Sequence, residues 1–203
     1  MAKQPRLLIA TRNPGKLEEL ASLLSGVPYA LLSLDDVGID SEIAEVGSSF
    51  EENATLKAVG YSAMSGLAAL ADDSGLEVDA LGGEPGVLSS RYAGAGATDS
   101  QKIAYLLRKL DSVADDKLGA RFRCAIAIAW PDRPVDVQYG ECHGRLVRTP
   151  RGDNGFGYDS IFLVDGLGKT MAELTAEEKN EISHRARAAR NAARVLMRVA
   201  AEG

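Results

Sequence analysis

Apolar and polar residues in the first third of the chain predict strands that alternate with helices. The apolar run at residues 6–10 predicts a short buried strand, which a Thr-Arg-Asn-Pro-Gly turn follows. Leucines at positions 17, 20, 23 and 24 share one face of the helix expected over residues 16–24. Ser49-Phe-Glu-Glu52 is typical of a capping box and predicts the start of a second helix, which should end near Gly66. The apolar run at residues 67–71 then predicts another strand.

The rest of the chain predicts two further helices and a β-hairpin. Residues 98–110 have the pattern of a capped amphipathic helix, and residues 121–130 alternate as a strand does. Residues 135–147 are expected to pair with that strand across a Pro-Asp-Arg-Pro turn, and another strand is expected at about residues 158–164. A last helix should carry the apolar residues of positions 182–200 on one side. A hairpin among helix-linked strands predicts an α/β fold with a central mixed β-sheet flanked by helices.

Length and composition describe an ordinary globular protein. With 203 residues, 45% of them apolar and 26% charged, the chain is expected to form a single domain over residues 1–203. No apolar run approaches the roughly 20 residues that span a bilayer, and the first residues lack the layout of a signal peptide. Cys124 and Cys142 form no Cys-x-x-Cys pair, so neither a disulfide framework nor a zinc site is expected. These features predict a cytoplasmic protein with no membrane partner.

The net charge of −6 argues against a protein that binds nucleic acid nonspecifically, because such proteins usually carry a basic stripe. Arginines recur at helical spacing between Arg185 and Arg198, and a solvated helix face is the favoured interpretation of that series. No nucleic-acid partner is therefore expected. A chain of this charge that binds phosphates must use a few placed cations together with a metal ion.

Two adjacent acids, Asp72 and Asp73, follow the apolar run and precede Ser74 and Gly75. An ordinary Asp-Ser-Gly turn and an acid site at the edge of a sheet are both open interpretations of this segment. Neighbouring carboxylates repel each other, and such a pair is usually placed where a cation neutralises it. Because successive strand residues point to opposite faces, one of the two acids should dominate any chemistry.

The turn between the first strand and the first helix is a candidate anion site. Thr11-Arg12-Asn13-Pro14-Gly15-Lys16 presents backbone N–H groups at the positive end of a helix, and the lysine adds a full charge. The segment is not a Walker A loop, since the upstream glycine and the Ser/Thr after the lysine are absent. A simple strand-to-helix turn is the alternative. On the next helix, Asn53 and Lys57 share a face, and a solvated pair is the alternative there.

Aromatic residues alternate with glycines in Gly155-Phe156-Gly157-Tyr158-Asp159. Glycine lets another group approach the backbone closely, and aromatic faces suit a planar ring such as a nucleobase; aromatic packing in the core is the alternative. His184 and Arg185, near the start of the last helix, are candidate hydrogen-bond donors to a ring carbonyl. Such donors would favour a 6-oxo purine over adenine, whose amine would leave them unpaired. Chance placement on a surface helix is the alternative.

Five segments of the chain resemble the inosine/xanthosine triphosphate pyrophosphatase family, and they occur in the family's order. They are distributed from residue 11 to residue 185, so the match extends over nearly the whole chain and is far more specific than any one motif. It implies a single ITPase-like domain with an active-site cleft between two lobes. It also implies hydrolysis of ITP, dITP and XTP to the nucleoside monophosphate and pyrophosphate, which removes deaminated nucleotides from the nucleotide pool. The segments are TRNPGK, GSSFEENATLKA, ADDSGLEVDALGGEPG, GFGYDSIF and ELTAEEKNEISHR.

The resemblance implies binding roles for several of the residues already named. Residues 11–16 would hold the triphosphate, with Lys16 as the main cation, and Asn53 and Lys57 would flank the phosphates. The base and sugar pocket would be formed by Phe156, Gly157, Tyr158, Asp159, Lys179, His184 and Arg185.

A magnesium site is also implied by the resemblance. Glu45 and Asp73 would be the Mg²⁺ ligands, and Asp73 would be the proton acceptor for the attacking water, with Asp72 and Ser74 beside it. Glu42 is an open alternative to Glu45, because both lie in the same acidic stretch.

Two other functions remain open. A related septum-inhibition type pyrophosphatase, which acts on other modified nucleotides, would keep the fold, although His184 and Arg185 speak against it. A non-catalytic nucleotide sensor would keep the pocket but would need no hydrolytic metal site, so Glu45 and Asp73 speak against it. The resemblance implies that the protein forms a homodimer. It also implies that the molecule it binds is a purine nucleoside triphosphate substrate.

Overall fold

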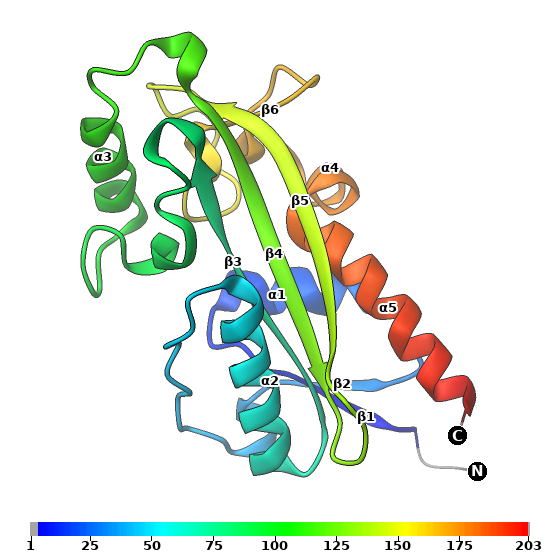
Figure 1. Ribbon diagram of the computed structural model, residues 1–203. Coiled ribbons are helices and arrows are strands. Elements are labelled where there is room, and N and C mark those ends of the chain that lie inside the picture. Colours follow the sequence, from blue (N-terminus) through cyan, green and yellow to red (C-terminus); the bar gives the residue numbers. More distant parts are fainter. Residues whose placement is uncertain (1–3, 203) are drawn as a thin grey trace. The chain divides into compact units, whose positions relative to one another are not determined.

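Six strands form one mixed β-sheet among residues 4–202, which are the residues that the computed structural model describes (Figure 1). The strands are β1 (Arg6–Ile9), β2 (Ala30–Leu32), β3 (Ala68–Val78), β4 (Gly119–Ala129), β5 (Asp136–Leu146) and β6 (Phe162–Val164). Their order in the sheet is β2-β1-β3-β4-β5-β6. β1 pairs in parallel with β2 and β3, whereas β5 and β6 pair antiparallel, so the predicted mixed sheet is confirmed.

The described residues divide into two compact units, and β3, β4 and β5 each contribute residues to both. The first unit contains residues 4–73, 124–140 and 185–202. The second unit contains residues 74–123 and 141–184. Within residues 4–202, none of the helices has the length and apolar character needed to cross a membrane.

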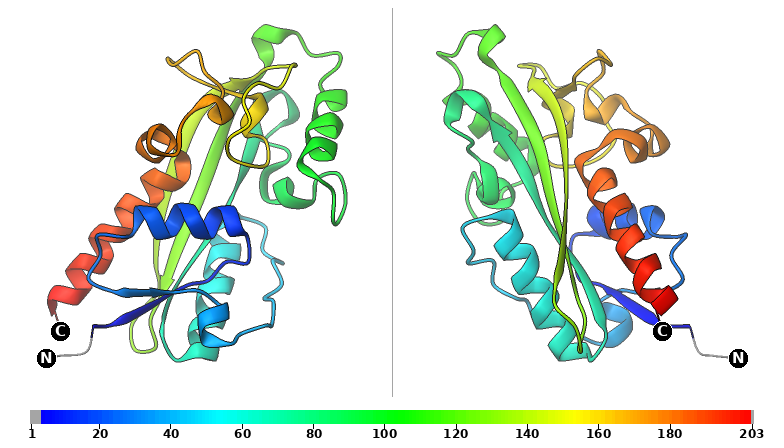
Figure 2. Two further views of the ribbon diagram at one scale, coloured as in Figure 1. Left: turned by 180° about the vertical axis from the view of Figure 1, so that it is seen from behind. Right: turned by 45° about the vertical axis from the view of Figure 1, so that its right-hand side comes forward.

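Three helices pack in the first unit: α1 (Pro14–Leu23), α2 (Phe50–Ser65) and, from its second residue onward, α5 (His184–Glu202). α1 and α5 lie on one side of the strands of this unit and α2 lies on the other (Figure 2). Leu20 of α1 and Leu196 of α5 are fully buried in a cluster with alternate residues of β1, β3 and β4. The apolar residues whose helical spacing predicted α1 and α5 therefore form part of the core of this unit.

The start of α2 differs in one detail from the predicted capping box. The Ser49 hydroxyl accepts a hydrogen bond from the Glu52 N–H at 3.1 Å, as predicted. The Glu52 carboxylate, however, accepts from the N–H of Ser48 at 2.6 Å and from the Ser48 hydroxyl at 2.8 Å, rather than closing the box on Ser49. Ser48 donates two hydrogen bonds to one carboxylate oxygen of Glu52, whereas the Ser49 N–H could donate only one. The helix ends at Gly66, as predicted.

The second unit contains α3 (Asp99–Lys109) and α4 (Ala176–Ile182). Thr98 and Gln101 form the capping box that starts α3, which confirms the predicted capped helix. Leu106 of α3 is fully buried in a core to which β3 to β6 also contribute. Phe122 and Phe162 are in contact in this core, with ring centroids 4.6 Å apart.

The strand that carries the acid pair is longer than predicted. β3 continues through Asp72–Gly75 to Val78, so the turn interpretation of this segment is wrong. The segment lies inside an 11-residue strand that is a neighbour of β4 in the sheet, and this strand context outweighs the local preference of Asp-Ser-Gly for a turn. Gly75 accommodates a close approach here, because a Cβ at this position would lie 2.3 Å from Ser89 Oγ.

Two later boundaries also differ from the prediction. Of the strand expected at residues 158–164, only Phe162–Val164 is extended in the sheet, and Asp159–Ile161 is a 3-10 turn. Ile182 belongs to α4 rather than to the last helix, because the extended backbone of Ser183 separates α4 from α5. Both breaks occur where polar side chains are buried, so tertiary contacts rather than periodicity decide the backbone there.

Candidate functional site

Asp72 and Asp73 are both buried in the first unit, with relative exposures of 1% and 6%. As neighbours in β3 they point to opposite faces and contact different cations. The two acids therefore meet different partners, and the dominance of one of them in the chemistry stays a prediction. Two buried carboxylates in sequence are unfavourable unless each is paired, so the partners decide what each acid can do.

Asp72 is held by two cations. Its Oδ2 lies 3.0 Å from Lys16 Nζ and accepts a hydrogen bond from Arg185 Nε at 3.2 Å. Burial alone would raise the pKa of the Asp72 carboxyl, but Lys16 and Arg185 outweigh it and hold that pKa below its ordinary value. Arg185 also forms an ion pair with Glu19 of α1. Asp72 is therefore a charged structural link between β3, α1 and the start of α5.

Asp73 has a less compensated environment. Its Oδ2 accepts a hydrogen bond from Asn53 Nδ2 at 3.1 Å, and its Oδ1 lies 3.6 Å from Lys57 Nζ. Burial raises the pKa of Asp73 above its ordinary value, even though Lys57 and Lys16 act in the opposite direction. Of the two acids, Asp73 is the one with the greater proton affinity.

Asn53 and Lys57 are not a solvated pair. Asn53 is fully buried, and its Oδ1 accepts a hydrogen bond from the Gly47 N–H at 2.7 Å while its amide binds Asp73. Lys57 contacts both Glu45 and Asp73. Burial lowers the pKa of Lys57, but the surrounding carboxylates outweigh it and raise that pKa. α2 thus brings an amide and an ammonium group to one acid.

Glu45 and Asp73 fit the chemistry of a magnesium ion. Both supply carboxylate oxygens, the ligands that Mg²⁺ prefers, and their shared contact with Lys57 places them in one neighbourhood. Among residues 4–202, no group of three His, Cys, Asp or Glu side chains is arranged to hold a metal ion. Two carboxylates are nevertheless typical where substrate phosphates supply the other ligands. Glu45 shares Lys57 with Asp73 whereas Glu42 is exposed, and the choice of Glu45 as the second ligand stays a prediction.

The loop between β1 and α1 connects the strand to the helix as predicted, and its binding of an anion stays a prediction. Asn13 caps α1, and its Oδ1 accepts from the Lys16 N–H at 3.0 Å. Thr11 Oγ1 accepts from the Asn13 N–H at 3.2 Å. Arg12 pairs with Asp35 at 3.1 Å and donates to the Ile39 carbonyl, whereas Lys16 reaches Asp72. Lys16 is therefore the cation of this loop that meets the acid pair.

Residues 155–159, here called the aromatic loop, lie in the second unit. Asp159 is buried, and its Oδ2 accepts from the Phe156 N–H at 3.1 Å and from Lys179 Nζ at 2.7 Å. Lys179 Nζ also lies 5.0 Å from the centroid of the half-buried Phe156 ring. Tyr158 is a core residue whose hydroxyl donates to the Ser89 carbonyl at 3.0 Å. Phe156 is thus the aromatic residue of this loop that remains a candidate for base stacking.

His184 and Arg185 have separate surroundings despite being adjacent. His184 is 4% exposed and stacks on Phe122 in the second unit, with ring centroids 4.7 Å apart. Arg185, in the first unit, is 2% exposed and pairs with Asp72 and Glu19. Neither lies on a surface helix face, so that alternative is wrong. The hydrogen bonds that His184 and Arg185 are expected to donate to a purine carbonyl stay a prediction.

Three residues that support these groups were missed at the level of sequence. Glu19 lies three residues after Lys16 on α1, a spacing that places both on one helix face, but its partner Arg185 is 166 residues away. Asp99 follows a helix cap and looked like an ordinary first-turn acid, although it accepts from the Gly157 N–H. Phe122 looked like a core residue and is one, and it also stacks on His184.

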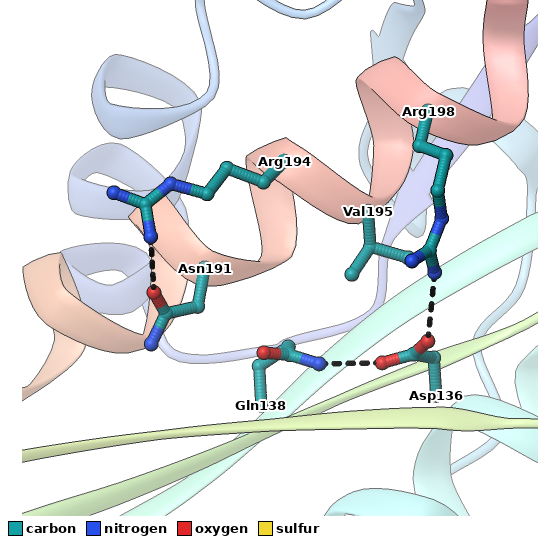
Figure 3. Close-up of a pocket in the computed structure, with 6 residues that line it drawn as sticks. All are labelled: Asp136, Gln138, Asn191, Arg194, Val195 and Arg198. Atoms are coloured by element: carbon teal, nitrogen blue, oxygen red, sulfur yellow. Dashed lines mark hydrogen bonds and ion pairs between the residues drawn. The ribbon is translucent and has the colours of Figure 1, made fainter.

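A cavity of about 290 Å³ lies elsewhere in the first unit, between β5 and α5 (Figure 3). Its polar side chains contact one another: Arg198 lies 3.6 Å from Asp136, Gln138 also donates to Asp136, and Arg194 donates to Asn191 at 3.3 Å. None of the predicted site residues lines it. This cavity is therefore separate from the acid pair.

The Ham1 family model matches residues 7–195 of this chain. The chain is 51% identical over 183 residues to a dITP/XTP pyrophosphatase of Geobacter sulfurreducens, which covers 90% of this chain and 92% of that protein. A dITP/XTP pyrophosphatase of Bacillus subtilis is 44% identical, over 93% of this chain and 96% of that protein. The solved structure of a HAM1 protein from Coxiella burnetii matches with a TM-score of 0.87 at 41% identity, covering 96% of this chain and 99% of that chain. Because these matches extend over nearly the whole sequence, the chain belongs to the Ham1 family.

Proposed function

We propose that this protein hydrolyses deaminated purine nucleoside triphosphates, namely dITP, XTP and ITP, to the nucleoside monophosphate and pyrophosphate. The observation that carries the proposal is the buried acid pair, in which Lys16 and Arg185 neutralise Asp72 while Asp73 lies beside Asn53 and Lys57. The Geobacter and Bacillus relatives are both named dITP/XTP pyrophosphatases, which supports the same reaction here. Removal of such nucleotides from the pool would follow from this activity.

The residues of the first unit suit each requirement of this reaction. A water must attack the α-phosphorus while the bond from that phosphorus to the oxygen bridging to the β-phosphate breaks, so that pyrophosphate leaves. Asp73 is suited to orient the water and accept its proton, because Asn53 and Lys57 hold its carboxylate in place. Lys16 and Lys57 are suited to neutralise phosphate oxygens as negative charge shifts toward the leaving group.

Mg²⁺ is the proposed cofactor. Glu45 and Asp73 would hold it, and when bound it would neutralise phosphate charge and lower the pKa of a coordinated water. Asn53 would keep Asp73 oriented through the hydrogen bond that it donates to Oδ2.

Pyrophosphate release from dITP, XTP, ITP, ATP and dTTP with Mg²⁺ tests the proposed function. We expect kcat/KM for the three deaminated purine nucleotides to exceed that for ATP by at least about a hundredfold, as hydrogen-bond readout of a base allows. Preferred hydrolysis of dTTP would instead indicate the related septum-inhibition type of enzyme. Binding of the nucleotides without release of pyrophosphate would indicate a nucleotide sensor.

Removal of the metal should abolish turnover. With EDTA in excess we expect dITP hydrolysis to fall to background and to return when Mg²⁺ is added back. Glu45→Gln should raise the Mg²⁺ concentration for half-maximal activity by roughly tenfold or more, as loss of a metal contact typically does. The matched variant Glu42→Gln changes an exposed acid in the same segment and should leave that concentration unchanged. Undiminished activity in EDTA would contradict the metal requirement, and equal effects of the two variants would contradict the choice of Glu45.

The homodimer and the cytoplasmic location stay predictions. Light scattering on the purified protein measures its molar mass, and a value of about twice that of the 21.5 kDa chain would support the homodimer.

A further inference from the structure

We propose that Asp99 is a positioning residue that holds the aromatic loop, residues 155–159, in the shape that binds the purine base. This inference rests on the proposed function, because the loop matters for catalysis only if it receives a nucleotide. It concerns a residue outside the predicted site, on the first turn of α3.

The contact between Asp99 and the loop joins two distant parts of the second unit. Asp99 Oδ2 accepts a hydrogen bond from the Gly157 N–H at 2.7 Å, across 58 residues of sequence. Gly157 has a φ of +66°, a conformation that only glycine adopts without cost, so the loop is bent tightly at this point. The hydrogen bond therefore fastens the loop at its bend.

Asp99 is itself held rigidly. It is the first residue of α3, which begins with the Thr98–Gln101 capping box and is anchored by the buried side chains of Ile103 and Leu106. Lys102 Nζ lies 2.7 Å from the other carboxylate oxygen, Oδ1. Each oxygen thus has its own partner, and the acid cannot turn away from the loop without losing one of them.

The charge of Asp99 strengthens this hydrogen bond. Partial burial raises the pKa of the Asp99 carboxyl, but Lys102 and the Gly157 N–H outweigh it, so that pKa lies below its ordinary value. The start of a helix also favours negative charge. A hydrogen bond to an ionised acceptor is roughly twice as strong as a neutral one. The carboxylate is therefore better suited to fix the loop than an amide of the same shape.

The loop is braced at two neighbouring N–H groups by two different acids. Asp159 accepts from the Phe156 N–H within the loop, and Asp99 accepts from the Gly157 N–H outside it. Phe156, whose ring has Lys179 Nζ 5.0 Å from its centroid, lies between these two attachments along the chain. Without Asp99, the backbone beside Phe156 loses its attachment to α3, and a planar base would meet a ring that is less well ordered.

The test compares Asp99→Ala and Asp99→Asn with the matched variant Asp111→Asn, an exposed acid just beyond α3. Two measurements are made on each: hydrogen exchange of the Gly157 amide by NMR, and kcat and KM for dITP. We expect both Asp99 variants to speed exchange at Gly157 and to raise KM, with kcat changed less than about twofold. Asp99→Ala, which loses the hydrogen bond, should raise KM by about tenfold, and Asp99→Asn, which keeps a weaker neutral acceptor, should raise it by less. Asp111→Asn should match the unaltered protein in both.

Several outcomes would overturn the proposal. An unchanged rate of hydrogen exchange at Gly157 in both Asp99 variants would show that Asp99 does not restrain the loop. A fall in kcat at constant KM would show that Asp99 does not act through binding of the base. If Asp99→Ala does not fold, Asp99→Asn decides, because it keeps the size of the side chain. If the unaltered protein hydrolyses none of the triphosphates, the proposed function is wrong. The role of Asp99 is then tested separately, by comparing hydrogen exchange at Gly157 and the affinity for inosine monophosphate between the Asp99 variants and the unaltered protein.

Discussion

Asp73→Asn is expected to fold normally and to lose at least about a hundredfold in kcat/KM for dITP, the scale of a lost general base. Asparagine keeps the size of the side chain and a hydrogen-bonding group toward Asn53, so the packing around β3 should survive. It cannot accept the proton of the attacking water, and its neutral oxygen is a poorer ligand for Mg²⁺. Steady-state kinetics with dITP measure the loss, and thermal unfolding checks that the variant is folded.

Asp116→Asn is the matched control for this variant, because it makes the same change at an exposed position of the second unit. Its kcat/KM should equal that of the unaltered protein. Turnover near that of the unaltered protein in Asp73→Asn would show that another group accepts the proton, and the assignment of the acid pair would then be wrong.

Arg185→Ala is expected to destabilise the protein by about 3 kcal/mol, near the low end of what loss of one partner from a buried ion pair costs. The change leaves the buried carboxylate of Asp72 with Lys16 and removes the ion pair of Glu19 with the arginine. Lys16 limits the loss, since it still neutralises Asp72. Urea unfolding measures the change in free energy of unfolding. The control is Arg187→Ala on the exposed face of the same helix, which should change that free energy by less than about 0.5 kcal/mol.

The same arginine is also predicted to favour inosine over adenosine nucleotides, and the two roles can be separated. Arg185→Lys keeps a positive charge near Asp72 but loses the guanidinium geometry that a bidentate contact needs. We expect this variant to be more stable than Arg185→Ala and yet to show a smaller ratio of kcat/KM for ITP over ATP. A ratio that is unchanged in both variants would exclude Arg185 as the reader of the base and leave it only its structural role at Asp72.

Most of the fold could be predicted because its elements carry strong periodic patterns. The helices with regular apolar faces, α1 and α3, and the alternating strand β4 were placed to within a few residues. The errors lie where tertiary contacts outweigh local preference. Asp72–Gly75 has the composition of a turn but is paired as a strand, and Ser183 separates two helices whose apolar residues look continuous in sequence.

The candidate site shows the same division. Glycine, lysine and acidic residues at motif spacings identified the loop before α1, the acid pair and the aromatic loop. Asp99 and Glu19 were not identified, because their partners are 58 and 166 residues away and nothing in local sequence records such a distance. Tyr158 lies in the aromatic loop but is packed in the core, which an alternating pattern of aromatics and glycines could not distinguish from a stacking residue.

The sequence by itself determined that two acids are adjacent directly after an apolar strand segment, and that they must face opposite sides if the strand continues through them, since the strand repeat of two residues is a local property of the backbone. The tertiary structure decided that the strand does continue through them. Only the tertiary structure decided which cations each acid meets. Lys16 and Arg185 reach Asp72 from α1 and α5, whereas Asn53 and Lys57 reach Asp73 from α2 on the other side of the strands. The difference in pKa that distinguishes the two acids follows from these partners and from burial. It depends on helices far apart in the chain, so it comes from packing rather than from any local pattern.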